Sequence, residues 1–328
     1  QRLVPRNMKS PIFTVRTAIR CLEDAKSIPT PMMLFDELWF EQELCILFAD
    51  TNVGKSLLAV QIAQSIASGT AIPGFHLGVQ GQPVLYYDFE INDKQFEQRY
   101  TNTMRNSYRF SSNFYRISYN PECKTQRIRS QDVFAEIRSH IEEYRSQVLI
   151  IDNLSYFASN SLETAQDATD FMREMKILKE EYRLSIMLLA HTPKRNKSLS
   201  ISEADLAGSA GLARLADSLI ALGKGGESQD QRYIKQIKVR SAMLNYGAEN
   251  VIKCRLAPNG GLLGFVFEGY SQESDLLRTT DRQNISEQVI AMRSQNPSLS
   301  QAEIARQLGI NKMRVSRILA REDSDENA

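Results

Sequence analysis

The stretch FADTNVGKSLLA, residues 48–59, lies between two segments with different patterns of apolar residues. Before it, ELCILFA (43–49) is a continuous apolar run, which is typical of a strand buried on both faces. After it, residues 55–68 place apolar side chains on one stripe of a helix. A strand, a loop ending in Gly-Lys-Ser (54–56) and a helix form the setting in which backbone N–H groups bind phosphate. The sequence therefore predicts a phosphate-binding loop.

Ala49 departs from the usual pattern of such a loop, which begins with glycine. The position lies where the strand enters the loop, so only a positive φ would make the Cβ costly, by about 1 kcal/mol. We therefore expect a non-positive φ at Ala49. Lys55 is expected to contact the β- and γ-phosphates of ATP, and Ser56 is expected to bind Mg²⁺. The predicted nucleotide-binding residues are Thr51, Asn52, Val53, Gly54, Lys55, Ser56 and Leu57.

Short apolar runs alternate with helical segments along most of the chain, which predicts an α/β fold with a mainly parallel central sheet. The predicted strands are 43–49, 83–90, 147–153, 184–191 and 217–223. The predicted helices are 55–68, 131–144 and 165–182. After residue 230 apolar residues alternate with polar ones, which indicates antiparallel strands at one edge, with a turn at 258–261.

The chain of 328 residues is long enough for one large α/β domain and a small second domain. Residues 271–284 are polar and aperiodic, which indicates a linker. The predicted organisation is an N-terminal extension (1–29), an ATPase domain (30–270), the linker (271–284) and a small all-α domain (285–328).

The net charge, the spacing of cysteines and histidines, and the lengths of the apolar runs limit the kinds of partner and metal site that this chain can have. The 40 Lys and Arg residues against 39 Asp and Glu give a formal net charge of +1, so nucleic-acid affinity would require local basic clusters. The four cysteines and three histidines are widely spaced, which argues against a zinc site or a disulfide scaffold. No apolar run reaches the roughly 20 residues of a membrane helix. These features favour a protein of the reducing cytoplasm with no membrane partner.

ATP hydrolysis also needs carboxylates at the ends of neighbouring strands. VLIID (148–152) ends in Asp152, which is placed to bind Mg²⁺. The next residue is Asn153 rather than Glu, so a base adjacent to Asp152 is excluded. We therefore assign the general base to Glu90, at the end of VLYYDFE, with Asp88 as the alternative. A strand-end carboxylate with no catalytic role is the other interpretation of Glu90.

The order of these elements resembles the RecA-like class of P-loop ATPases. More specifically, four segments resemble the hexameric replicative helicase family carried by plasmids and mobile elements. They are ADTNVGKSLLAVQIAQSIASGTAIPG (49–74), VLYYDFEIND (84–93), VLIIDNLS (148–155), and LLAHTPK (188–194) followed by DLAGSAGLARLADSLIAL (205–222). The resemblance spans roughly residues 30–270. It implies that His191 contacts the γ-phosphate region and that Ser209 begins a helix near the nucleotide or the DNA.

Two basic segments have possible roles beyond the nucleotide site. Lys238-Val239-Arg240 resembles the Lys-x-Arg element that supplies cations to the ATP site of a neighbouring subunit, an effect worth about 10³ or more in rate. An edge strand with charges on its solvent face is the alternative. The loop 193–207 carries Lys194, Arg195 and Lys197, and it is either a channel loop that tracks nucleic acid or a solvated loop.

The C-terminal sequence SLSQAEIARQLGINKMRVSRILAR (298–321) fits a helix-turn-helix, with the turn at Gly309. Ser300 and Glu303 form a capping box at the start of its first helix. The second helix carries basic residues and no acidic ones up to residue 321. The predicted DNA-binding residues are Asn311, Lys312, Arg314 and Arg317. A helical module that docks a protein is the alternative.

These features together predict an oligomeric, Mg²⁺-dependent ATPase that acts on DNA, a helicase-like protein of a mobile genetic element or plasmid. The expected partners are single-stranded DNA in the ATPase ring, duplex DNA at the helix-turn-helix, and further copies of the chain in a homo-oligomer such as a hexamer. The predicted catalytic residues are Glu90, Lys55, His191, Arg240 and Lys238, and the predicted metal ligands are Ser56 and Asp152. A nucleotide-switched DNA-binding regulator that does not translocate is the alternative function.

Overall fold

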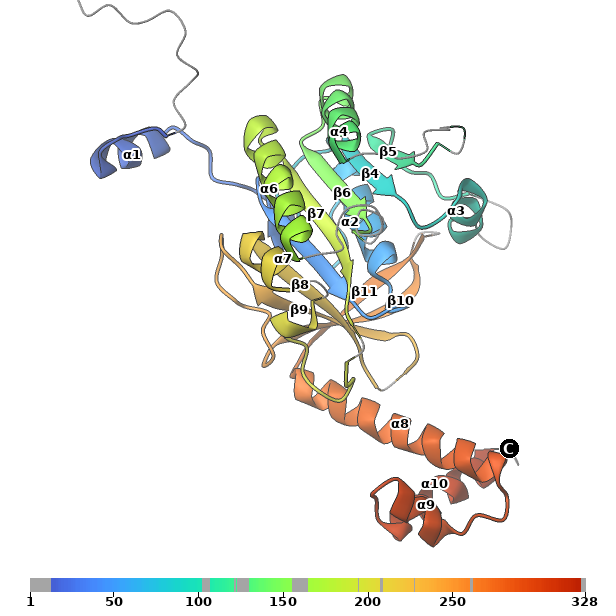
Figure 1. The fold of residues 1–328 in the computed structure, drawn as a ribbon. Helices are drawn as coiled ribbons and strands as arrows, with labels where there is room; N and C mark the ends of the chain where they lie inside the picture. Colours follow the sequence, from blue (N-terminus) through green and yellow to red (C-terminus); the bar gives the residue numbers. More distant parts are fainter. Residues whose placement is uncertain are drawn as a thin grey trace, which may run out of the picture.

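The computed structural model describes residues 13–101, 107–120, 122, 130–154, 165–193, 195–206, 209–226, 228–259 and 262–325. Within them, the central sheet has nine strands in the order β11-β10-β9-β8-β3-β7-β6-β4-β5 (Figure 1). Its strands are β3 (Leu44–Ala49), β4 (Val84–Asp88), β5 (Phe114–Ser118), β6 (Val148–Asp152), β7 (Ser185–His191), β8 (Ser218–Lys224), β9 (Gln231–Lys238), β10 (Val251–Asn259) and β11 (Leu262–Ser271). A separate small sheet pairs β1 (Met33–Phe35) with β2 (Trp39–Phe40).

Strands β8 to β5 along this order are parallel, whereas β9, β10 and β11 join antiparallel to one edge. The predicted α/β fold with a parallel centre and an antiparallel edge is therefore confirmed. Strand β3 lies near the middle of the sheet, with β7 separating it from β6. The carboxyl ends of β3, β7, β6 and β4 consequently meet at one edge.

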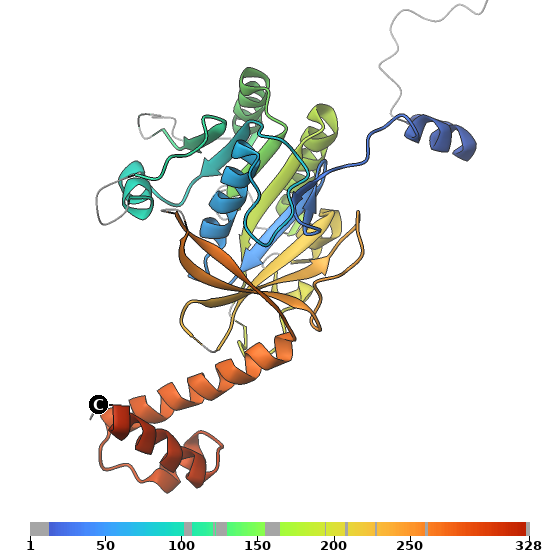
Figure 2. The same ribbon diagram turned by 180° about the vertical axis from the view of Figure 1, so that it is seen from behind.

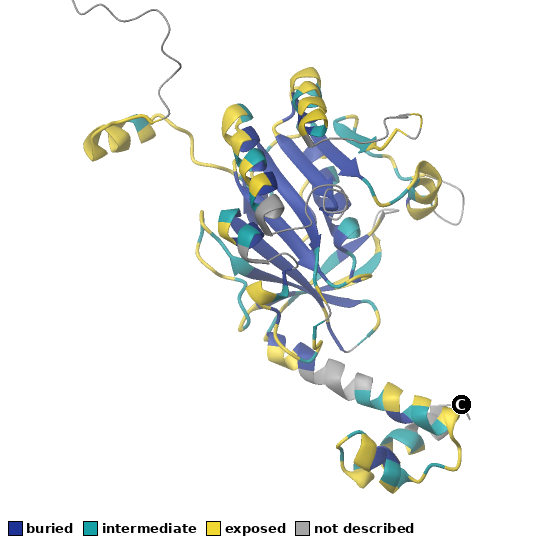
Figure 3. Ribbon diagram, in the orientation of Figure 1, coloured by how far each residue is buried: buried dark blue, intermediate teal, exposed yellow. Residues whose placement is uncertain are grey.

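Helices cover both faces of the parallel strands. They are α2 (Lys55–Ser68), α4 (Ser130–Tyr144), α6 (Ala165–Tyr182) and α7 (Ser209–Leu215), with α3 (Asp93–Arg99) and a short 3₁₀ helix η1 (Glu203–Asp205) at the periphery. Side chains of β3 alternate between the two faces, because successive strand residues point in opposite directions. Cys45, Leu47 and Ala49 pack in the cluster with α2, whereas Leu44, Ile46 and Phe48 pack in the cluster with α4 and α6. Burial on both faces explains the continuous apolar run (Figure 3).

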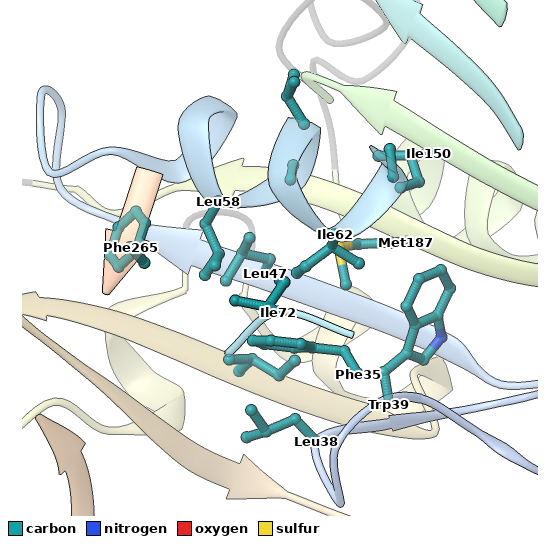
Figure 4. Packing of buried hydrophobic residues seen from close by; sticks show 14 of the residues in the cluster. Phe35, Leu38, Trp39, Leu47, Leu58, Ile62, Ile72, Ile150, Met187 and Phe265 are labelled. Carbon is teal, nitrogen blue, oxygen red and sulfur yellow. The ribbon is translucent and has the colours of Figure 1, made fainter. Parts of the chain in front are cut away.

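Helix α2 packs its predicted stripe against the sheet. Leu58, Ile62 and Ile66 are fully buried, and Leu58 and Ile62 lie above Leu47 in Figure 4. The helix ends at Gly69, whose φ of +68° is a left-handed conformation that suits glycine.

The β10–β11 hairpin packs against α2. The Gln61 side-chain amide donates to Phe265 O (3.0 Å) and accepts from Phe265 N (2.7 Å), so it pairs with the β11 backbone on both sides. The antiparallel edge therefore braces the helix that begins at the phosphate-binding loop (Figure 2).

The segment 271–284 differs from its prediction as an aperiodic linker, because helix α8 (Glu273–Gln295) runs through it. The segment is polar yet helical, so its lack of apolar periodicity does not mean an irregular backbone. Among its described side chains, Leu276 and Leu277 are buried at the start of the helix and Val289 is buried near its end. Figures 1 and 2 show α8 leading away from the sheet to the last two helices.

The C-terminal helices α9 (Gln301–Gln307) and α10 (Lys312–Asp325) form the predicted helix-turn-helix with the end of α8. Val289, Ile304, Ala305 and Val315 form its core. The turn residue Gly309 has φ +62°, which confirms the reason for a glycine there. By contrast, α1 (Ala18–Ala25) in the N-terminal extension lies apart and buries none of its residues (Figure 3).

Candidate active site

The phosphate-binding loop joins β3 to α2, as its sequence predicts. Ala49 is the last residue of β3 and is absent from the left-handed residues of the described chain, so the expected non-positive φ is confirmed. Two loop residues do adopt positive φ, Asn52 (+64°) and Gly54 (+112°). Gly54 O accepts the bond from Leu58 N that opens α2 (3.0 Å). Alanine is thus tolerated at the strand end because the strained positions lie further along the loop.

The strand register brings the predicted site residues together. Ala49 pairs with His191 across β3 and β7, and Asp88 pairs with Asp152 across β4 and β6. Glu90 follows β4 by two residues, so its side chain reaches the same edge as the loop. Its Oε2 atom lies 3.5 Å from Ser56 Oγ, which places the second strand's glutamate beside the first turn of α2.

Lys55 lies in the centre of this group. Its side chain is buried, and Nζ donates to Ala49 O (3.2 Å) and to His191 Nδ1 (3.0 Å). Burial lowers the pKa of Lys55, and the charges of Asp152, Glu90 and Asp50 oppose that shift. A cation is therefore held by neutral acceptors at the point where the loop can bind phosphate.

His191 connects Lys55 to Glu90. Because the Lys55 ammonium can only donate, Nδ1 of His191 accepts, and the remaining ring proton of a neutral imidazole resides on Nε2. Nε2 lies 3.4 Å from Glu90 Oε1. The His191 hydrogen bond is the main cause that lowers the pKa of Glu90, with burial opposing it, so Glu90 stays a carboxylate at neutral pH.

Asn153 is a site residue that sequence reasoning used only by exclusion. Its Nδ2 atom donates to Glu90 Oε1 and lies 3.2 Å from His191 Nε2. The side chain is buried directly after Asp152, to which it is joined by a cis peptide bond. Asn153 therefore holds the carboxylate of Glu90, the predicted base.

Asp152 is buried beneath the loop. Tyr86 Oη donates to Asp152 Oδ2 (2.7 Å), while Oδ1 is buried and has no hydrogen-bond partner among the described residues. Burial raises the pKa of Asp152 to about 6; the charge of Glu90 adds to this effect, and contacts with Ser56 and Tyr86 oppose it. A buried carboxylate oxygen without a partner, close to a serine hydroxyl, is a donor set that suits Mg²⁺.

Asp88, the alternative base, makes contacts that differ from those of Glu90. Its Oδ1 atom accepts from the backbone N–H groups of Glu90 (3.1 Å) and Ile91 (3.2 Å), and Oδ2 is 2.8 Å from Arg116 Nε. These bonds shape the turn that carries Glu90. The structure thus favours Glu90 over Asp88 as the group that faces the loop.

Lys238 and Arg240 lie at the other end of the strands from the phosphate-binding loop, near the first residues of β8 and β3. Lys238 Nζ donates to Ala213 O (2.9 Å) and Ala216 O (2.8 Å) at the end of α7, a favourable position for a cation. Arg240 Nη1 is 2.7 Å from Asp217 Oδ1, and Asp217 also accepts from the first residue of β3, Leu44. The length of β3 separates them from the loop, about 16 Å. Neither cation reaches the phosphate-binding loop of its own chain.

The basic loop after β7 is only partly as expected. Lys194 lies outside the described residues, and Lys197 is exposed. Arg195 points inward instead of toward solvent: its side chain is 7 % exposed and forms ion pairs with Asp50 (3.8 Å) and Asp205 (3.4 Å). The prediction of a solvent-facing cation is therefore wrong for Arg195, because two carboxylates of its own chain bind it.

Arg232 on β9 was also missed by sequence reasoning. It is buried, and its Nε atom donates to Val53 O in the phosphate-binding loop (2.6 Å). In the sequence, nothing distinguishes this arginine from the other charged residues of the alternating segment after residue 230. Its inward direction depends on the register between β8 and β9, which the sequence does not contain.

The predicted DNA-facing residues of the helix-turn-helix lie on its surface. Asn311, Lys312 and Arg317 are exposed, and Arg314 is half-buried. Asn311 has a structural role as well, because its Oδ1 atom accepts from Met313 N at the start of α10 (2.8 Å). Of the predicted capping box at α9, the bond from Glu303 N to Ser300 Oγ is present (3.2 Å), whereas the Glu303 carboxylate binds Arg306 and Gln307.

The raised pKa of Asp152 predicts a stability change in metal-free, nucleotide-free protein. Between pH 3.8 and about 6 the folded state holds the proton more tightly than the unfolded state, so stability falls as pH rises through that range. Above pH 6 the cost is fully present, at most about 3 kcal/mol. We expect Asp152→Asn to raise the melting temperature at pH 8 in EDTA and to leave it unchanged near pH 4. Equal destabilisation at both pH values would contradict the assignment.

The sheet order, the loop with its buried lysine, and the carboxylates on the strands beyond β7 define a P-loop ATPase domain with a RecA-like fold. A family model described as an AAA domain (AAA_25) matches residues 16–197, more than half of the chain, and the chain belongs to this family. A second model, sigma-70 region 4, matches residues 285–321, which contain the helix-turn-helix.

The chain is similar to many solved structures, of which two are described. One is an ATPase domain with a TM-score of 0.53 at 13% identity, and the match covers 76% of this chain and 96% of that one. The other is a KaiC-like protein from Pyrococcus horikoshii with a TM-score of 0.47 at 14% identity, covering 70% and 91%. The likeness to the first structure supports the fold alone. No curated protein matches the chain. In the described part of the chain, no helix has the length and apolar character needed to cross a membrane.

Proposed function

We propose that this protein hydrolyses ATP with Mg²⁺ and couples hydrolysis to DNA binding, as a helicase-like oligomer. The observation that carries the proposal is the contact chain from Lys55 through His191 to Glu90 at the mouth of the phosphate-binding loop. A solvated Gly-Lys-Ser turn would have no reason to bury its lysine against the histidine and glutamate of two other strands.

Each residue has a distinct part in the proposed reaction. The backbone of residues 51–57 and the ammonium of Lys55 bind the triphosphate. Glu90 accepts a proton from the attacking water, and Asn153 and His191 hold its carboxylate in place. His191 also lies between the base and the lysine, so it can respond to the charge at the γ-phosphate.

The proposed metal ligands are Ser56 and Asp152, and the unpartnered Oδ1 atom of Asp152 supports this choice. When bound, Mg²⁺ supplies positive charge to the β- and γ-phosphate oxygens. Asp152 then remains ionised at neutral pH, because the cation offsets the cost of its burial.

Assembly of several copies would complete the site. Arg240 is 55 % exposed on its side chain and too far from the loop of its own chain, so a neighbouring chain is the place where it would act on phosphate. Lys238 is less available, because α7 carbonyls bind its ammonium. A head-to-tail contact of this kind generates a ring when its rotation closes and an open filament when it does not. The motif resemblance to plasmid and mobile-element replicative helicases supports a ring that takes up single-stranded DNA, in the cytoplasm.

The helix-turn-helix is the proposed duplex-binding part. Lys312, Arg314 and Arg317 give α10 a basic surface, and the match to sigma-70 region 4 supports DNA as its ligand. The alternative is a nucleotide-switched regulator that binds duplex DNA without translocating. The inward position of Arg195 favours the regulator, because a cation that would track single-stranded DNA in a motor is bound by Asp50 and Asp205 of its own chain.

ATP turnover with and without single-stranded DNA distinguishes the two functions. A motor should hydrolyse ATP faster when single-stranded DNA is added, and its solution mass should be that of a ring. A regulator should hydrolyse slowly whether or not single strands are present and should bind duplex DNA. An unstimulated, monomeric protein would contradict the helicase-like proposal while leaving the ATPase site intact.

A further inference from the structure

Arg195 belongs to the segment that follows β7, and its side chain lies against the start of the phosphate-binding loop. Its Nη1 atom is 3.8 Å from Asp50 Oδ2, and Asp50 is the first residue after β3. Its Nη2 atom donates to Leu199 O, and its Nε atom is 3.4 Å from Asp205. The side chain is almost fully buried. One guanidinium therefore ties the entrance of the nucleotide loop to residues 199–205.

Residues 200–201 of this segment are also bound by Glu273, the first residue of α8. Glu273 is 1 % exposed, and its Oε1 atom accepts from Ile201 N (2.9 Å) and from Tyr233 Oη (3.0 Å). Its Oε2 atom accepts from Ser200 Oγ and from Lys235 Nζ (2.5 Å), and Lys235 also donates to Ile201 O (2.7 Å). A buried and satisfied network of this kind fixes one geometry, so residues 200–201 cannot move without the start of α8.

Helix α8 continues this connection to the C-terminal domain. It runs without interruption over 23 residues, about 34 Å. Its distal part supplies Val289 to the core of the helix-turn-helix, beside Ile304 and Val315. Figures 1 and 2 show the helix as the connection between the sheet and α9–α10. A shift at Glu273 would therefore be carried to the proposed DNA-binding surface.

Nucleotide binding would act directly on the first link. A triphosphate at residues 51–57 brings several negative charges next to Asp50, which repels them, and within range of Arg195, which attracts them. The Asp50–Arg195 ion pair is long, and Thr192 Oγ1 donates to Asp50 as a second partner. The carboxylate can thus keep a hydrogen bond while the guanidinium shifts.

We propose that Arg195 and Glu273 couple the nucleotide site to the helix-turn-helix, so that duplex DNA binds with different affinity in the nucleotide-bound and nucleotide-free chain. The inference rests on the proposed ATP site at residues 51–57. Coupling of this kind is reciprocal: duplex DNA changes the affinity for ATP by the same factor. The chain would therefore link loading at the duplex site to its nucleotide state.

Hydrogen exchange of the full chain, with and without Mg²⁺ and a non-hydrolysable ATP analogue, tests the coupling. In the native chain we expect protection at residues 51–57 together with changed exchange at 199–201 and 273–277. Arg195→Gln should keep the protection at 51–57 and lose the change at 273–277. Lys197→Gln, an exposed lysine of the same loop, is the matched control and should behave as the native chain does.

Fluorescence anisotropy with a labelled duplex of mixed sequence gives the functional readout. We expect the analogue to change duplex affinity about fivefold or more in the native chain and the Lys197→Gln control. In Arg195→Gln, and in Glu273→Gln as a second variant, the ratio should approach one. Protection at 51–57 without any change at 273–277 in the native chain would overturn the coupling and spare the ATP site. Absence of protection at 51–57 would overturn both.

Discussion

Glu90→Gln should lower the rate of ATP turnover by a factor of about 10² to 10⁴ while leaving ATP binding nearly intact. The amide has the shape of the carboxylate and can keep a hydrogen bond with Asn153, but it cannot accept the proton of the attacking water. The lost step is chemical, so kcat should fall and KM should change little. Steady-state phosphate release and equilibrium titration with a fluorescent ATP analogue together measure both quantities.

The matched control is Glu97→Gln on α3, where the carboxylate pairs with Lys94 at the surface. That ion pair is exposed and should contribute less than about 1 kcal/mol to stability, so turnover should stay native. Asp88→Asn is the informative comparison with the alternative base. Because Asp88 also shapes the turn that carries Glu90, a partial loss in Asp88→Asn is compatible with either base. If Glu90→Gln kept a native kcat while a normally folded Asp88→Asn lost it, the assignment of the base to Glu90 would be wrong.

Arg240→Ala should lower turnover by about 10³ if this side chain stabilises the transferred phosphoryl group in a neighbouring site. Folding should be nearly unaffected, because Asp217 keeps its bonds to Lys179 (3.0 Å) and Leu44 N (3.0 Å). The control is Arg255→Ala, which removes a comparable surface ion pair with Glu268. Melting temperature, solution mass and phosphate release are measured for both variants.

Mixing Arg240→Ala with Glu90→Gln separates action in trans from action in cis. In a random ring, about a quarter of the interfaces would join an intact Glu90 to an intact Arg240 from the neighbouring subunit. Activity should therefore reappear on mixing two inactive proteins. If activity did not recover in a mixture shown by mass to contain both subunits, the action of Arg240 in a neighbouring site would be contradicted. The ion pair with Asp217 would then be the role of Arg240 that remains.

Much of the ATPase fold follows from sequence periodicity. The continuous apolar runs become central strands because helices cover both faces of the sheet, as the alternating burial of β3 demonstrates. Helices α2 and α6 have the predicted bounds, Lys55–Ser68 and Ala165–Tyr182. Both carry regular apolar stripes, and Gly69 ends α2 with the positive φ expected of a terminal glycine. Local signals were sufficient where local and global preferences agreed.

The missed features depend on contacts that are distant in sequence. The helical backbone of α8 was missed because the polar segment 271–284 has no apolar periodicity. Arg195 and Glu273 were not recognised as buried groups, since their partners lie on β9, on η1 and just after β3, and no short motif joins them. Asn153 was used only to exclude a base, although its bond to Glu90 spans 63 residues of sequence.

Phosphate release from ATP by Lys55→Ala tests the central claim most directly, because the buried ammonium of Lys55 is the group on which the whole site converges. The native chain and the variant are purified in the same way and assayed with Mg²⁺ and single-stranded DNA. The proposed site predicts turnover by the native chain and release at the level of a protein-free sample for the variant. Equal turnover by the two proteins would show that ATP is hydrolysed somewhere other than the loop at residues 51–57.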